Sequence, residues 1–222
     1  LKRLSDALTA AANESGRFVA LTGEAGIGKS RLVAALTTSH AAAGVLWLEG
    51  RCTEMGSAAA FGPFVEMLES HFSRQTGDAA GAVQGELAAL TAAGRLAEEE
   101  AAEIAALFAR LLAGGAQAGA GGMDAQQMQY RAMRAVCCFV AALCEEQPVA
   151  LVLDDIHWAD SLSLDLAGQL LETAASHRLL LLAVYRDDGT PALHRLEQSA
   201  ARLLGRRAEV LKLIPFSPEE SR

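Results

Sequence analysis

Hydrophobic residues along this chain gather in short unbroken runs, each bounded by glycine, proline or charged residues. An unbroken apolar run of strand length is typical of a β-strand that is buried on both faces of a parallel sheet. Five segments have this pattern: Arg17–Thr22, Gly44–Glu49, Val149–Asp155, Arg178–Tyr185 and Glu209–Ile214. The pattern therefore predicts five buried strands.

Between these runs, apolar residues recur at the three- and four-residue spacing of amphipathic helices. Pro63 suits the first turn of one such helix, and Ser161 is a candidate cap for another. Helices are predicted over Leu1–Ala12, from Ser30 to about His40, from Phe61 onward, from Asp124 to about Glu146, over Leu162–Ala175 and over Pro191–Leu204. This alternation predicts an α/β three-layer sandwich, with a mostly parallel five-stranded sheet and helices on both faces.

The segment 75–122 interrupts the alternation, and we expect a helical and glycine-rich insertion that is partly flexible. A helical piece around 96–113 places Ile104, Leu107, Phe108 and Leu111 on one face. The tract 114–122 consists mostly of glycine and alanine, which is typical of a flexible loop. We expect the whole range 1–222 to be a single core domain with this insertion, cut from a longer protein.

One loop between a predicted strand and a predicted helix carries the strongest chemical signal. The sequence GEAGIGKS, at Gly23–Ser30, matches the phosphate-binding pattern G-x-x-x-x-G-K-[ST], called the P-loop or Walker A motif. Its glycines allow backbone N–H groups to approach phosphate oxygens, and the helix that follows adds a positive dipole end. Lys29 supplies a positive charge for the β- and γ-phosphates, and the Ser30 hydroxyl is placed to bind Mg²⁺. The predicted nucleotide-binding residues are Gly23, Glu24, Ala25, Gly26, Ile27, Gly28, Lys29, Ser30 and Arg31.

A second motif supports the first. The run Val149–Asp155 is an apolar strand that ends in two carboxylates, the Walker B pattern. Ligands bind at the carboxyl ends of strands in open α/β sheets, so both motifs are expected at one edge. Asp154 is predicted to hold Mg²⁺ together with Ser30, and Asp155 to polarise the attacking water. The alternative is an ordinary core strand followed by a solvated acidic turn.

Composition limits the classes of partner. Of the 222 residues, 51% are hydrophobic, and the formal net charge is −8 with a pI of about 5.2. This acidic balance argues against nucleic-acid or membrane binding by this segment. The cysteines Cys52, Cys137, Cys138 and Cys144 have no zinc-ligand spacing, and we interpret them as buried free thiols in a cytoplasmic protein. No run is long enough for a membrane helix.

The residues that follow the Walker B strand resemble one family in particular. The stretch Leu153–Ser161, LDDIHWADS, resembles the AAA/STAND-type P-loop ATPase module, also described as the origin-recognition-like AAA ATPase domain. Such modules occur in large LuxR-type transcriptional regulators and in some multidomain nucleotide cyclases and kinases. The segments Gly50–Cys52 with Phe61–Phe64, Leu182–Arg186 and Ile214–Glu220 resemble further motifs of the family.

This resemblance implies roles that spacing alone does not give. Lys29, Asp155 and Arg186 are then the catalytic residues, with Arg186 as a sensor of the γ-phosphate; the alternative for Arg186 is a solvated strand end. Trp158 is interpreted as a packing anchor, with stacking on the adenine ring as the alternative, and His157 as either a relay of the nucleotide state or a structural histidine. The family's G-R-E entry motif is absent upstream of the first helix, and its helical lid would follow Arg222.

The resemblance implies a slow regulatory ATPase that binds ATP and Mg²⁺ and acts as a molecular switch. Its expected partners are ATP or ADP and the neighbouring regulatory and output domains, with transcription control as the output; self-association is a further candidate. One alternative is an oligomeric remodelling ATPase with steady turnover, for which Arg202, Arg206 and Arg207 are the candidate arginines by position. Another is a nucleotide-binding scaffold with negligible hydrolysis.

Overall fold

The strands form one parallel sheet. The computed structural model describes residues 1–54, 60–76, 79–113, 125–187 and 189–214. Within these residues the sheet has five strands, and every neighbouring pair is parallel. Their order across the sheet is β2 (Leu46–Arg51), β3 (Val149–Asp154), β4 (Leu179–Tyr185), β1 (Arg17–Thr22) and β5 (Ala208–Lys212). The predicted α/β class with a five-stranded parallel sheet is confirmed.

The central strands are mostly apolar because both of their faces are covered. Along β3, Leu151 and Leu153 belong to one hydrophobic cluster, whereas Ala150 and Val152 belong to the other. All four side chains are fully buried. Successive side chains of a strand point to opposite faces, so a strand between two helical layers needs an apolar residue at every position.

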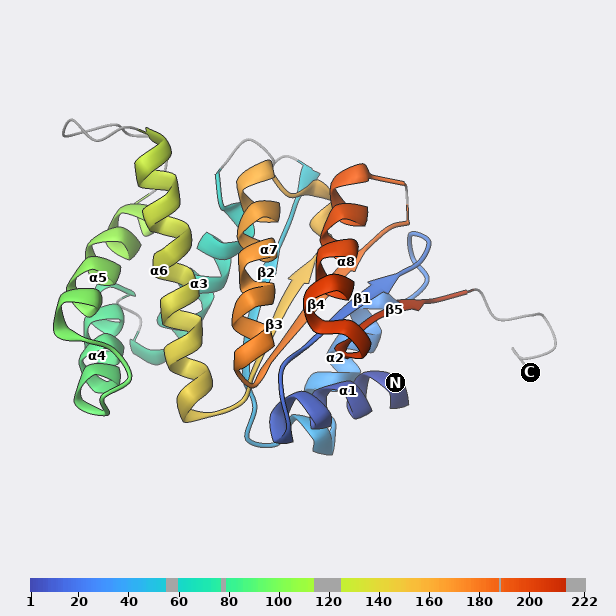
Figure 1. Ribbon diagram of the computed structural model, residues 1–222, viewed down its shortest axis with the longest axis horizontal. Coiled ribbons are helices and arrows are strands. Elements are labelled where there is room, and N and C mark those ends of the chain that lie inside the picture. The colour runs from blue at the N-terminus through green and yellow to red at the C-terminus, as the bar shows by residue number, and fades with distance from the viewer. Residues whose placement is uncertain (55–59, 77–78, 114–124, 188, 215–222) are drawn as a thin grey trace.

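Helices cover the two faces unequally. The smaller cluster lies between the sheet and α1 (Lys2–Asn13), α2 (Lys29–Thr37) and η1 (His40–Ala42). The larger cluster includes α7 (Ser161–Ser176) and α8 (Pro191–Leu204), which stand in front of the sheet in Figure 1. The short η5 (Gly205–Arg207) joins α8 to β5. In the described part of the chain, no helix has both the length and the apolarity needed to cross a bilayer.

A helical group extends the larger cluster beyond β2, on the left of Figure 1. It consists of α3 (Gly62–Thr76), α4 (Ala79–Ala92), α5 (Glu98–Leu112) and α6 (Ala125–Glu146). Phe72, Phe108 and Phe139 meet at its centre, and each is 0% exposed. Their ring centroids lie 5.3 to 6.2 Å apart, at tilted or edge-on angles that suit aromatic pairs. The predicted helix at 96–113 is thus present, and α4 is an additional helix; the glycine tract 114–122 lies outside the described residues.

Two local predictions need correction. The cap of α7 is Asp160, whose Oδ1 accepts a hydrogen bond from the Ser163 backbone N at 3.0 Å, and not Ser161, which is the first helical residue. The second strand, β2, lies two residues further along the chain than the predicted Gly44–Glu49. This shift matters for the site, because it makes Arg51 the last residue of β2.

The strand order determines which chain segments meet. Because β4 lies between β1 and β3, the carboxyl end of β4 opens between the segments that follow the other two. Gly23 follows β1, Asp154 ends β3 and Arg186 follows β4. In a parallel sheet the carboxyl ends share one edge, so the three sequence motifs come together there.

Candidate functional site

The P-loop has the strand–loop–helix form that its sequence predicts. The strand β1 ends at Thr22, and α2 begins at Lys29 with Gly28 as its N-cap. Gly26 and Gly28 have φ values of 74° and 100°, in the left-handed region that favours glycine. The first N–H groups of α2 have no carbonyl partner within the helix, so they remain available to an anion at its N-terminus.

Lys29 is folded back onto its own loop. The residue is 7% exposed, and its Nζ donates hydrogen bonds of 2.9 Å to the carbonyl oxygens of Gly23 and Glu24. Burial lowers the pKa of Lys29, and the Arg186 cation lowers it further, whereas the carboxylates of Asp155 and Asp154 act in the opposite direction. The ammonium group therefore lies inside the loop, where the charges of both acidic residues and of Arg186 act on its pKa.

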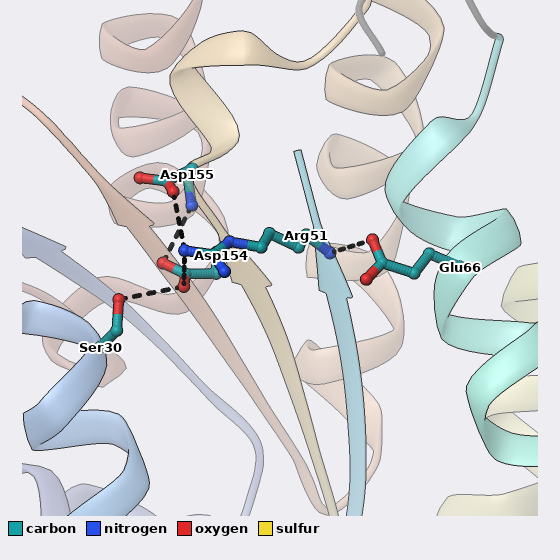
Figure 2. Close-up of polar contacts among 5 residues, drawn as sticks. All are labelled: Ser30, Arg51, Glu66, Asp154 and Asp155. Atoms are coloured by element: carbon teal, nitrogen blue, oxygen red, sulfur yellow. Dashed lines mark hydrogen bonds and ion pairs between the residues drawn. The ribbon is translucent and has the colours of Figure 1, made fainter. Parts of the chain in front are cut away.

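A direct hydrogen bond joins the two predicted motifs. The Ser30 Oγ donates to Asp154 Oδ2 at 3.1 Å, although the residues are 124 positions apart. Asp154 is 5% exposed, and its Oδ1 accepts from the backbone N of Asp155 at 3.0 Å. Figure 2 shows this contact between the start of α2 and the end of β3. A hydroxyl and a carboxylate are hard oxygen donors of the kind that Mg²⁺ takes, so the residues present fit this ion.

These oxygens leave most of an Mg²⁺ coordination shell to other ligands. Among the described residues, no three His, Cys, Asp or Glu side chains form a group that could hold a metal ion by themselves. Mg²⁺ ordinarily keeps several waters and is bound by one or two protein groups plus substrate phosphates. The donor set therefore suits an ion that arrives with a phosphorylated ligand.

Asp155 occupies an unusual backbone conformation. Its φ and ψ are 54° and 34°, which is the left-handed region, and it caps the short η4 (Ile156–Trp158). Aspartate adopts this conformation more readily than most residues, and such positions are found preferentially at functional sites. The Asp155 side chain is 27% exposed and so remains accessible from solvent.

Arg51 is a site residue to which the sequence analysis assigns no role. Its Nη2 lies 3.5 Å from Asp155 Oδ2 and 3.9 Å from Asp154 Oδ2. Its backbone N donates to Glu66 Oε2 at 3.0 Å, so α3 holds the end of β2 (Figure 2). The signal available in the sequence is a basic residue at the end of a strand whose carboxyl end lies on the ligand-binding edge.

The remaining predicted residues are placed as follows. Glu24, Ala25, Gly26 and Arg31 are exposed at the P-loop, and Ile27 is partly exposed. Arg186 is exposed just beyond β4. Trp158 packs against the larger hydrophobic cluster, as expected of an anchor, and its ring lies 5.0 Å from that of His157.

The basic residues at the end of α8 lie far from the carboxyl edge of the sheet, where the P-loop lies. The helix α8 starts after the carboxyl end of β4 and ends before the first residue of β5, so its last turn lies near the amino edge of the sheet. Arg207 there donates to the backbone oxygens of Gly16 and Ala175, at 3.0 and 3.4 Å. Arg207 thus ties α7 and the start of β1 together, and neither Arg202 nor Arg206 is close to the P-loop of its own chain.

All four cysteines are free thiols. Cys52 and Cys144 are buried as expected, whereas Cys137 and Cys138 are only partly buried. Burial raises the pKa of Cys52, Cys137 and Cys144 to about 12, with nearby carboxylates adding to the effect at Cys52. These three thiols are therefore protonated, and we assign them to packing.

The site combines a P-loop that contains a buried lysine with two carboxylates at the end of a strand that lies two strands away in the sheet. This combination defines a nucleotide-binding α/β domain. The family model described as "AAA ATPase domain" matches residues 1–182, and the chain belongs to this family. It is accordingly an ATP-binding domain of the ATPase class.

Two individual proteins are similar to this chain. An uncharacterized protein of Rhizobium meliloti (strain 1021) is 26% identical over 171 residues, which are 77% of this chain. The match spans only 16% of that protein's length. The structure of the Aeropyrum pernix Orc1 protein in complex with DNA matches 99% of this chain and 45% of its own, with 17% identity and a TM-score of 0.45.

Proposed function

We propose that this domain is an Mg²⁺-dependent regulatory ATPase, which acts as a molecular switch within a longer signalling or transcription regulator. The observation that carries the proposal is the 3.1 Å hydrogen bond between Ser30 and Asp154. It joins the phosphate-binding loop to the acidic end of β3, and both are needed to hold a nucleotide with its metal ion.

Binding rests on charge and on positioned N–H groups. The backbone of the loop from Gly23 to Gly28 would surround the β- and γ-phosphates, together with the N-terminus of α2. Lys29 would turn from the carbonyl oxygens of Gly23 and Glu24, which it binds at 2.9 Å, toward the incoming phosphate oxygens. Ser30 and Asp154 would hold Mg²⁺, which neutralises charge on the β- and γ-phosphates when it is bound.

Hydrolysis would depend on Asp155. Its carboxylate is partly exposed and adjacent in sequence to the metal-binding Asp154, where it can orient a water molecule in line with the γ-phosphorus. Phosphoryl transfer needs little covalent chemistry from the protein, so positioning and charge stabilisation would supply most of the effect.

The switch hypothesis is supported by how the Arg186 segment is attached. On one side of Arg186, the Tyr185 hydroxyl donates to Glu197 of α8. On the other side, the Nζ of Lys212 in β5 lies 2.6 Å from Asp187 Oδ2. If Arg186 reads the γ-phosphate, these two contacts would carry a change in its position to α8 and β5. Neighbouring domains would then sense the nucleotide state.

Turnover measurements separate this proposal from its alternatives. A switch should hydrolyse ATP slowly, at about 10⁻³ s⁻¹, which is the order of unassisted hydrolysis by P-loop proteins. A remodelling ATPase should turn over steadily at about 1 s⁻¹ or faster. A scaffold should bind ATP and release no phosphate above the Asp155→Asn background. Phosphate release under single-turnover and steady-state conditions gives all three outcomes.

Within the proposed regulator, this domain is expected to contact other domains and to make no direct contact with nucleic acid. The net charge of −8 disfavours phosphate-backbone contacts by this segment. Fluorescence anisotropy with labelled duplex DNA should show no binding by the isolated domain at physiological salt. Micromolar binding there would contradict this part of the proposal.

A further inference from the structure

A positively charged side chain, that of Arg51, lies beside the two carboxylates of the site. A single nitrogen of Arg51, Nη2, faces the Oδ2 atoms of both Asp154 and Asp155, at 3.9 and 3.5 Å. The same Oδ2 of Asp154 accepts the hydrogen bond from Ser30. The oxygen best placed to bind a metal ion is therefore already shared between a hydroxyl and a guanidinium group (Figure 2).

Three contacts hold the backbone of Arg51 at this place. It pairs with Asp154 in the parallel register of β2 and β3, and the next residue, Cys52, donates its backbone N–H to the backbone carbonyl oxygen of Asp154 at 2.9 Å. From the outer side, Glu66 accepts the Arg51 N–H at 3.0 Å. The Arg51 side chain itself is 56% exposed, so it can move away while its backbone stays fixed.

The positive charge of Arg51 should lower the affinity of the site for a metal ion. Two carboxylates on adjacent residues repel each other, and a cation within about 4 Å of both relieves that repulsion. A divalent ion at Ser30 and Asp154 would lie within a few ångströms of the guanidinium and would be repelled by it. Metal and Arg51 therefore compete for the same negative charge.

We propose that Arg51 is the internal counter-ion of the nucleotide-free site: it takes the place of the metal's charge and keeps divalent-ion affinity low until a nucleotide brings its own phosphate ligands. The inference rests on the proposed metal site at Ser30 and Asp154. It makes Arg51 a positioning residue for the acidic pair, and it makes metal and nucleotide bind together.

The test is Mn²⁺ binding to the nucleotide-free domain, measured from the free-ion signal in electron paramagnetic resonance. Arg51→Gln should tighten Mn²⁺ binding about tenfold, since it removes one nearby positive charge from a partly solvated site. Arg51→Lys should stay close to the parent. Arg95→Gln, which breaks an exposed ion pair with Glu145 far from the site, is the matched control and should change nothing.

Adding Asp154→Asn to Arg51→Gln should abolish the gain in Mn²⁺ affinity. This result would show that the ion binds at Asp154. An Arg51→Gln domain that binds Mn²⁺ no more tightly than the parent would overturn the inference and would make the contact an ordinary surface ion pair. ATP binding measured on the same samples keeps the two proposals apart. ATP binding that depends on Lys29, with Mn²⁺ affinity unmoved by Arg51→Gln, would retract only the role of Arg51.

Discussion

Replacing Gly50 by alanine tests how tightly α3 is packed against the end of β2. A Cβ atom at this position would lie 2.0 Å from the carbonyl oxygen of Pro63 and 2.7 Å from its carbonyl carbon. Both are backbone atoms in the first turn of α3. Contacts below 3.0 Å are essentially never observed, so the strand and the helix must separate by about 1 Å (3.0 − 2.0).

This separation has a calculable cost. Forcing an extra carbon into a packed interior typically costs 1–3 kcal/mol, and a clash with backbone atoms, which cannot rotate away, belongs at the upper end, about 3 kcal/mol. For a domain of this size, such a loss lowers the melting temperature by about 6–12 °C. The same movement would lengthen the hydrogen bond between Arg51 and Glu66.

Urea denaturation followed by far-UV circular dichroism measures the effect. Gly168→Ala is the matched control, because a Cβ there meets no atom within 4 Å and the position lies inside α7. It should raise stability by about 0.5–1 kcal/mol. If Gly50→Ala unfolds within about 0.5 kcal/mol of the parent, the packing of α3 on β2 described above is wrong.

Three further predictions follow from other residues. Asp155→Asn should keep ATP binding and lower single-turnover hydrolysis by at least about a hundredfold, since it replaces the water-orienting carboxylate with a neutral amide of similar shape; near-parent hydrolysis would exclude that role. Phe139→Ala, at the centre of the aromatic group, should lower the free energy of unfolding by about 3–5 kcal/mol in urea, and a loss below about 1 kcal/mol would contradict the packing. At pH 9, alkylation of Cys52, Cys137 and Cys144 should be at least about a hundredfold slower in the folded than in the urea-unfolded chain, because burial keeps these thiols protonated. Above about pH 8.5 the native state retains these protons while the unfolded chain loses them, so the free energy of unfolding should fall as pH rises. Equal alkylation rates in the folded and the unfolded chain would refute the protection of these thiols.

Strands and the phosphate-binding loop could be predicted because their signals are local. The run from Val149 to Leu153 is apolar at every position, and the P-loop carries its glycines and lysine at fixed spacing. Burial of a strand on both faces and the tight turn of a phosphate-binding loop both restrict residues that are adjacent in the sequence. The helix α4 was missed because alanine and glycine are frequent on its exposed side and Ala82 is also buried, so little apolar contrast marks its inner face.

Contacts between distant segments could not be predicted in the same way. The cap of α7 was misplaced by one residue because Asp160 and Ser161 are both good capping residues, and only the backbone decides between them. The end of β2 packs against α3 at Gly50, where a Cβ atom would lie 2.0 Å from the carbonyl oxygen of Pro63, and this close approach is a contact between distant segments. The place of Arg51 beside Asp155 depends on the bounds of β2 and on the pairing of β2 with β3.

The proposed function requires Gly23–Ser30 to form a working phosphate site around Lys29. Calorimetric titration of the domain with ATP and Mg²⁺, beside the same titration of Lys29→Ala, shows whether it does. The variant loses two charge-assisted hydrogen bonds to phosphate, each contributing about 1.5–3 kcal/mol, so affinity should fall by at least about a hundredfold. We predict micromolar binding by the parent and none measurable in Lys29→Ala. Equal affinity in the two proteins would contradict the assignment of the site.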